Sequence, residues 1–113
     1  MLYLICTPIG NLNDFSLRSI NTLKEVDKIY AEDTRVAAKL MQYFDISKKS
    51  IPFHEHNELN QISEITDSLQ SGKNIAVMSD AGAPLISDPG LILVKKCIEE
   101  NIDVYPVPGA SAV

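Results

Sequence analysis

The sequence predicts an α/β fold in three layers, α/β/α, built on a mainly parallel sheet of about five strands. One observation is that five short apolar segments recur along the chain, with stretches of helical period between them. The other is that these segments are continuously apolar, which is typical of strands buried on both faces of a sheet. Together the two observations favour a parallel sheet with helices on both of its faces.

The expected strands are the segments 2–6, 28–31, 50–53, 74–78 and 103–107. Four of them end on small or polar residues: TPIGN follows the first strand, EDTR the second, SDAGAPLISDPG the fourth and PGAS the fifth. No internal repeat or linker interrupts the pattern, and 113 residues are about the length of one domain with its own core. The last residues, PVPGASAV, are typical of a turn and the start of a further helix. We therefore expect the chain to be the N-terminal part of a longer protein.

Four helices are expected, each with an apolar stripe at a spacing of three to four residues. Ser16 is the expected N-cap of the first helix, and Gly72 is expected to end the third. Asp88 is expected to cap the fourth helix, with Pro89 at its first position. In chain order the stripes are Leu17, Ile20, Leu23 and Val26; Val36, Leu40, Tyr43 and Phe44; Ile62, Ile65 and Leu69; and Leu91, Val94 and Ile98.

The charge distribution excludes a generic polyanion-binding domain, because such domains are usually strongly basic. The net charge is −5, and it is unevenly spread. Residues 1–49 carry seven Lys and Arg against six Asp and Glu, whereas residues 50–113 carry three against nine. Any contact with nucleic acid is therefore expected from local positive charges, namely Arg18, Arg35, Lys39, Lys48 and Lys49.

Neither a membrane span nor a metal site is expected. No segment approaches the roughly 20 apolar residues of a membrane span, and the N-terminus lacks the basic region of a signal peptide, so we expect a cytoplasmic protein. Cys6 and Cys97 have no metal-type spacing, and both are expected to be buried as small hydrophobic side chains. His54 and His56 flank Glu55 with no third ligand nearby, so a loop that opens a helix is the favoured interpretation.

In open parallel sheets, ligands bind beyond the carboxyl ends of the strands, which directs attention to the loops that follow them. TPIGN has neither the glycine pattern of a dinucleotide site nor that of a phosphate-binding loop. One interpretation of EDTR is a helix start capped by Asp33 or Thr34. The other is that Arg35 pairs with a substrate phosphate or carboxylate while Glu32 or Asp33 handles a hydroxyl. In SDAGAPLISDPG, helix initiation explains the final ISDPG but not the preceding SDAGAP, so a ligand is expected there.

Five motifs, in their order and spacing, carry a resemblance that runs the whole length of the chain: TPIGNLND (7–14), AEDTR (31–35), HEHNE (54–58), SDAGAPLISDPG (79–90) and PVPGASA (106–112). With them the chain resembles the ribosomal RNA methyltransferases of the tetrapyrrole methylase-like family. Two departures are mild: Val36 stands where His commonly follows EDTR, and Ala110 stands where Pro is common.

The resemblance implies a two-domain methyltransferase of which residues 1–113 form the N-terminal α/β domain, with S-adenosylmethionine bound in the cleft between the domains. It implies methyl transfer to the ribose 2′-hydroxyl of a cytidine in the 16S RNA of the small ribosomal subunit, by a homodimer. The fragment alone is expected to be inactive and to bind the cofactor weakly or not at all. Two alternatives stay open: a methylase of the same superfamily acting on a tetrapyrrole or a protein, and a non-catalytic dimerisation or ligand-binding module.

Carried onto this chain, the resemblance implies two sets of site residues and no metal ligand. Glu32, Asp33 and Arg35 would face the nucleic acid and are the catalytic candidates, with Asp80 as a further carboxylate to test. The cofactor-binding candidates are Thr7, Pro8, Gly10, Ser79, Asp80, Ala81, Gly82, Pro108, Gly109 and Ser111.

Overall fold

The computed structural model describes residues 1–7, 15–53, 58–79 and 88–107, and it contains the nine elements that the sequence predicts, in the same order. Each strand lies within one residue of its predicted position. The elements are β1 (Leu2–Cys6), α1 (Leu17–Glu25), β2 (Lys28–Ala31), α2 (Thr34–Tyr43), β3 (Ser50–Pro52), α3 (Glu58–Gln70), β4 (Ile75–Ser79), α4 (Asp88–Glu99) and β5 (Val104–Pro106).

The five strands form one sheet in the order β3-β2-β4-β1-β5, and every pair of neighbours is parallel. The central strand β4 pairs with β1 over five positions, from Leu2 opposite Ile75 to Cys6 opposite Ser79. On its other side β4 pairs with β2, beginning with Lys28 opposite Ile75. The predicted parallel α/β class is therefore confirmed.

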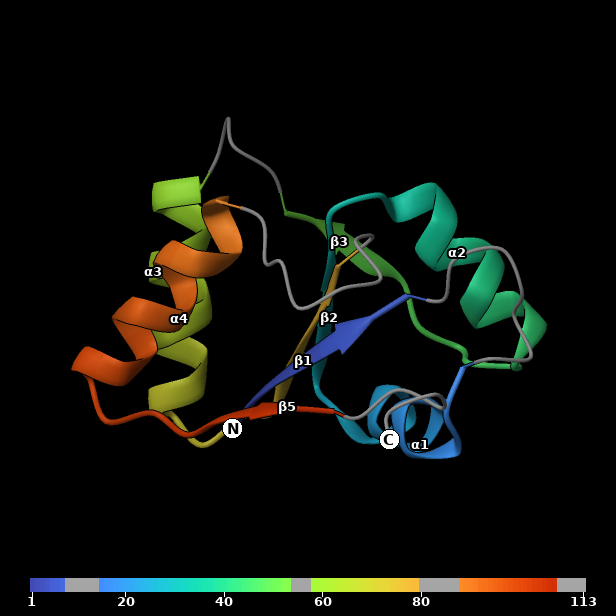
Figure 1. The fold of residues 1–113 in the computed structure, drawn as a ribbon, viewed down its shortest axis with the longest axis horizontal. Helices are drawn as coiled ribbons and strands as arrows, with labels where there is room; N and C mark the ends of the chain where they lie inside the picture. The colour runs from blue at the N-terminus through green and yellow to red at the C-terminus, as the bar shows by residue number, and fades with distance from the viewer. Residues whose placement is uncertain (8–14, 54–57, 80–87, 108–113) are drawn as a thin grey trace.

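Helices cover both faces of the sheet, two on each face (Figure 1). Side chains of α1 and α2, among them Leu23 and Leu40, pack with Ile5 of β1 in one apolar cluster. Side chains of α3 and α4, among them Ile65 and Leu93, form a second cluster on the opposite face. The two clusters divide the strand residues by alternation, as a sheet buried on both faces requires.

The predicted apolar stripe is correct for α3, is correct for α1 except at Leu17, and is shifted in α2 and α4. In α2 the buried residues are Ala37, Leu40 and Met41, and in α4 Leu93 and Cys97 are fully buried. The physical reason is that alanine and cysteine occupy buried positions, so a stripe drawn through the largest side chains points away from the sheet. Predicted stripe residues that are instead exposed are Leu17 (71% of its surface), Val36, Tyr43, Leu91 and Ile98.

The start of α1 and the end of α3 agree with the residues that the sequence predicts, whereas the start of α4 differs by one residue. The Oγ of Ser16 accepts a hydrogen bond from the Ser19 N–H at the start of α1 (3.1 Å). Gly72 has φ +96° after the end of α3, a conformation that glycine adopts without steric cost. Helix α4 begins at Asp88, one residue before the predicted first position at Pro89, and the side chains of these two residues lie outside the described part of the structure.

Lys48, in the segment between α2 and β3, caps the C-terminal end of α1. Its Nζ donates hydrogen bonds to the carbonyls of Leu23 (3.0 Å), Lys24 (2.7 Å) and Val26. These carbonyls lie at the end of α1, where the last turn of a helix leaves carbonyls without an intrahelical partner. The ammonium therefore joins two segments of the chain that are distant in sequence.

Candidate functional site

The carboxyl end of β4 is the point at which the connections of the sheet diverge. Strands β1 and β2 lie on either side of β4, and both lead to helices on one face, α1 and α2. Strand β4 leads to α4 on the opposite face. Ligands of open α/β sheets bind in the crevice that such a divergence leaves between the strand ends. We therefore take the carboxyl end of β4 as the candidate site, at the edge to which the sequence also directs attention.

Thr7 and Ser79, two of the predicted cofactor-binding residues, lie together at this edge. Thr7 is buried, with 4% of its surface exposed, and it follows β1 directly. Its backbone N–H and its Oγ1 both donate to the Ser79 carbonyl, at 2.8 and 2.9 Å. This double hydrogen bond fixes the ends of β1 and β4 relative to each other, so that the loops leaving them start from a fixed frame.

A short row of polar side chains crosses the carboxyl edge on the face of α3 and α4. Cys6 and Ser79 are register partners, and the residues two positions before them, Leu4 and Val77, pack in the α3/α4 cluster. Alternation along the strands therefore directs Cys6 and Ser79 to that same face. The N–H of Glu32 donates to the Met78 carbonyl (3.3 Å), which places Glu32 beside the end of β4 on its other side.

The polar groups of this row fit a ligand with hydrogen-bonding groups. The Ser79 Oγ is buried and has no hydrogen-bond partner within the described part of the chain. A buried hydroxyl without a partner costs about 1–3 kcal/mol, a cost that a bound ligand removes by supplying one. Partial burial beside the strand ends and the nearby Glu32 carboxylate together raise the pKa of the Cys6 thiol above its ordinary value, so the thiol stays protonated at neutral pH.

Cys6 corrects one expectation from the sequence. Both cysteines were expected in the core, but only Cys97 is buried there, and Cys6 is exposed. The physical reason is its position: Cys6 is the last residue of β1, at the edge that the helices leave uncovered, whereas Cys97 lies on the inner face of α4. Alternation from Leu4 and register with Ser79 are the signals that place Cys6 beside Ser79 at this edge.

Asp33, a predicted catalytic candidate, serves as the N-cap of α2. Its Oδ1 accepts hydrogen bonds from the backbone N–H groups of Arg35 (2.9 Å) and Val36 (3.4 Å). These two hydrogen bonds, with a smaller contribution from the charge of Arg35, hold the pKa of Asp33 below its ordinary value. The Arg35 side chain is 89% exposed, and its Nε lies 3.6 Å from the Asp33 Oδ1. The capping interpretation of EDTR is therefore confirmed for Asp33, and Arg35 extends into solvent.

The positive charges proposed for nucleic-acid contact divide into two groups. In the first group the side chain is bonded to another segment of the chain. Lys48 donates to backbone carbonyls at the end of α1, and Arg18 donates to the Tyr105 hydroxyl (2.7 Å), with its guanidinium over the Tyr105 ring. Arg35, Lys39 and Lys49 are exposed. Lys49 also lines a hollow of about 500 Å³ between α2 and β3.

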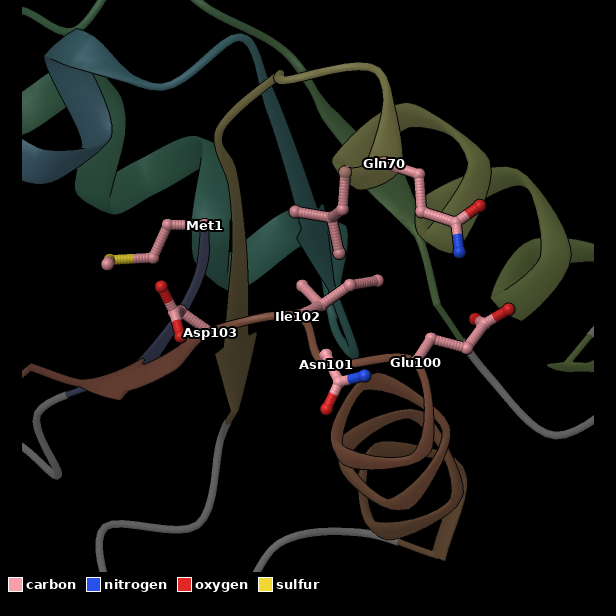
Figure 2. Close-up of a pocket in the computed structure, with 7 residues that line it drawn as sticks. Met1, Gln70, Glu100, Asn101, Ile102 and Asp103 are labelled. Carbon is pink, nitrogen blue, oxygen red and sulfur yellow. The ribbon is translucent and has the colours of Figure 1, made fainter.

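A further hollow lies at the amino-terminal edge of the sheet, opposite the candidate site. It has a volume of about 370 Å³ and is lined by Met1, Leu69, Gln70, Glu100, Asn101, Ile102 and Asp103. Figure 2 shows that this lining comes from the ends of α3 and α4 and from the starts of β1 and β5. None of the predicted site residues belongs to it.

Several predicted residues lie outside the described part of the chain, so their roles stay predictions. Within residues 1–7, 15–53, 58–79 and 88–107, no group of three or more His, Cys, Asp or Glu could hold a metal ion. No helix in these same ranges is long and apolar enough to cross a membrane.

The predicted residues that lie outside the described ranges are the cofactor candidates Pro8, Gly10, Asp80, Ala81, Gly82, Pro108, Gly109 and Ser111, and the residues His54, Glu55 and His56.

Comparison with known proteins gives one family and a consistent set of relatives. The family described as Tetrapyrrole (Corrin/Porphyrin) Methylases matches residues 1–113. Proteins named Ribosomal RNA small subunit methyltransferase I are 52% identical over 113 residues in a Synechocystis strain, 55% over 111 residues in Streptococcus pyogenes and 48% over 113 residues in Vibrio cholerae. These alignments cover 98–100% of this chain and 39–40% of the relatives. The chain thus spans about two fifths of their length.

Solved structures of low sequence identity share the fold. A diphthine synthase superimposes with a TM-score of 0.75 at 12% identity, and the match covers 97% of this chain and 44% of the synthase chain. The uroporphyrin III C-methyl transferase from Thermus thermophilus superimposes with a TM-score of 0.67 at 17% identity, covering 96% of this chain and 48% of its own. At these identities the likeness concerns the fold alone.

Proposed function

Because this chain belongs to the tetrapyrrole (corrin/porphyrin) methylase family, we propose that its protein transfers a methyl group from S-adenosylmethionine to ribosomal RNA of the small subunit. The acceptor we propose is the ribose 2′-hydroxyl of a cytidine. The observation that carries this proposal is the identity of 48–55% to the small-subunit RNA methyltransferases over 98–100% of the chain. The five motifs that follow strands or open helices support the same substrate.

The carboxyl edge of the sheet is where we propose that the cofactor binds. When bound, S-adenosylmethionine supplies a methyl group already activated on a sulfonium, so transfer depends mainly on proximity and orientation. Thr7 would hold the strand ends in place through its two hydrogen bonds to Ser79. The buried Ser79 hydroxyl would receive a hydrogen-bond partner from the cofactor. The loop residues Pro8, Gly10, Asp80, Ala81, Gly82, Pro108, Gly109 and Ser111 would complete the proposed site.

Glu32 is the carboxylate that we propose as hydrogen-bond acceptor for the attacking hydroxyl. A ribose hydroxyl is a weak acid, and it needs an acceptor for its proton as it attacks. Asp33 is a poor choice, because its Oδ1 is occupied by two backbone N–H groups and its pKa is held low. Glu32 lies beside the end of β4, close enough to Cys6 for its charge to raise the pKa of that thiol. Arg35 would contact RNA phosphate from its exposed position at the start of α2.

The experiment is methyl transfer by the full-length protein from labelled S-adenosylmethionine to unmodified small ribosomal subunits. We expect the label on a cytidine ribose after nuclease digestion. Label on a base, on a protein or on a tetrapyrrole would refute the substrate, and absence of transfer would favour the non-catalytic alternative.

The role of Glu32 is tested by E32Q, with D33N and E25Q as matched changes of charge. General acid–base groups contribute about 10²–10⁴-fold, so E32Q should lower kcat by at least 100-fold. D33N keeps a capping side chain, and Glu25 is an exposed residue of α1, so both variants should retain kcat within about threefold. A D33N loss as large as that of E32Q would contradict the assignment.

A homodimer in the cytoplasm is the assembly and compartment that we propose along with this activity. Light scattering on the purified full-length protein measures the mass of the assembly directly, and twice the monomer mass is the expected result. A monomer mass at micromolar concentration would contradict it.

A further inference from the structure

Cys6 is exposed at the carboxyl end of β1, where the strand leaves the cover of the helices. Strand β1 lies between β4 and β5, and helices cover both of its faces. Leu2 and Ile5 of this strand are at most 1% exposed, Tyr3 and Leu4 are half-buried, and Thr7, directly after Cys6, is 4% exposed. Cys6 alone among these is exposed, so the helices leave the sheet uncovered above the end of β1 on the α3/α4 face.

The neighbour of Cys6 in the sheet independently indicates a ligand at this spot. Ser79 is opposite Cys6 in register, on the same face, and its buried Oγ lacks a hydrogen-bond partner among the described residues. Glu32, on the other side of β4, adds a negative charge within electrostatic reach of Cys6. An uncovered thiol, an unsatisfied hydroxyl and a carboxylate thus lie side by side across three strands.

We infer that Cys6 forms the floor of the cofactor site on the α3/α4 face of the sheet, in contact with the bound S-adenosylmethionine. This inference rests on the proposed function. It adds one contact residue for the cofactor and the face of the sheet on which the cofactor lies. A neutral thiol offers a small, polarisable contact surface, and the Glu32 carboxylate beside it favours a ligand that carries positive charge. The sulfonium and the amino group of S-adenosylmethionine are such charges.

The experiment uses the two cysteines of this chain as target and control in the full-length protein. Cys6 is exposed, whereas Cys97 is fully buried and burial raises its pKa to about 11. N-ethylmaleimide should therefore modify Cys6 and leave Cys97 intact in the folded protein, as read by peptide mass mapping. Saturating S-adenosylmethionine should slow the modification of Cys6 by at least tenfold. Protein modified at Cys6 should bind the cofactor at least tenfold more weakly in calorimetry.

Two variants separate contact from damage to the fold. C6S removes the reactive thiol at nearly unchanged side-chain size, so N-ethylmaleimide should no longer weaken cofactor binding by this variant. E32Q should speed the modification of Cys6, because Glu32 helps to keep this thiol protonated. Modification of Cys6 at the same rate with and without cofactor, or unchanged affinity after modification, would overturn the inference and leave the proposed function standing. Calorimetry that detects no cofactor binding by the unmodified protein would overturn both.

Discussion

Replacing Lys48 by methionine should destabilise the protein through the C-terminal end of α1. The ammonium of Lys48 donates to three backbone carbonyls, those of Leu23, Lys24 and Val26. Methionine keeps the aliphatic part of the side chain and removes the charged donor. Its loss leaves the two part-buried carbonyls of Leu23 and Val26 without their partner, whereas the exposed carbonyl of Lys24 is hydrated by solvent.

The magnitude follows from these contacts. Each part-buried carbonyl that loses its donor costs about 1 kcal/mol, and removal of a cation from a helix C-terminus costs about 0.5 kcal/mol more. K48M should therefore lower the free energy of unfolding by about 2.5 kcal/mol. Urea unfolding, followed by circular dichroism, measures this difference.

The matched control is K49M, which makes the same change of charge one residue along at an exposed lysine. Surface substitutions of this kind usually change stability by less than about 0.5 kcal/mol. Equal unfolding free energies for K48M and K49M would refute the capping role of Lys48. The same two variants should also differ in affinity for RNA. K49M should lower this affinity because it removes an exposed positive charge, whereas K48M should lower it only to the extent that the protein unfolds.

Two further predictions concern the start of α2 and the α3/α4 core. The pKa of Asp33 is lowered by its hydrogen bonds to the N–H groups of Arg35 and Val36, so its stabilisation is present above about pH 4 and is lost as the pH falls through the folded-state pKa. Wild type should therefore exceed D33N in unfolding free energy at pH 6 and lose that advantage at pH 2, and an advantage equal at both pH values would contradict the reasoning. Ile65 is fully buried, and I65A should cost about 2–5 kcal/mol in urea unfolding, whereas L59A, at a residue 76% exposed in the same helix, should cost less than about 0.5 kcal/mol. Similar losses for these two variants would show that α3 packs by another face.

The arrangement of strands and helices could be predicted because each strand is continuously apolar and each helix is separated from it by turn residues. The buried face of a helix was harder to predict wherever small side chains occupy it. Ala37 and Cys97 face the sheet, while the larger Val36 and Ile98 face solvent. Which residues face the sheet depends on how closely a helix approaches it, and that distance is a tertiary property that local periodicity does not contain.

The edge of the sheet that holds the candidate site was also predictable, because ligand loops of parallel sheets follow the strands. The separate roles of the residues in EDTR could not be predicted from the sequence. Asp33 caps α2, and only the pairing of the strands shows that Glu32 lies beside the end of β4. Lys48 was expected to contact nucleic acid, but it bonds a helix end 22 to 25 residues away in sequence. A contact of this range arises from packing, and the local sequence around Lys48 carries no sign of it.

The position of β1 within the sheet has a consequence for how the chain folds during synthesis. Strand β1 is made first, yet both of its neighbours are made late, since Leu2 pairs with Ile75 and Val104. At about 5–20 residues per second, the ribosome needs roughly 4–15 seconds to produce its first partner. Strands β2 and β3, by contrast, pair over a short separation and are free to form early. The apolar segment LYLIC therefore waits without a partner strand while α1, β2, α2 and β3 assemble, and it is the segment that a ribosome-associated chaperone should protect in the nascent chain.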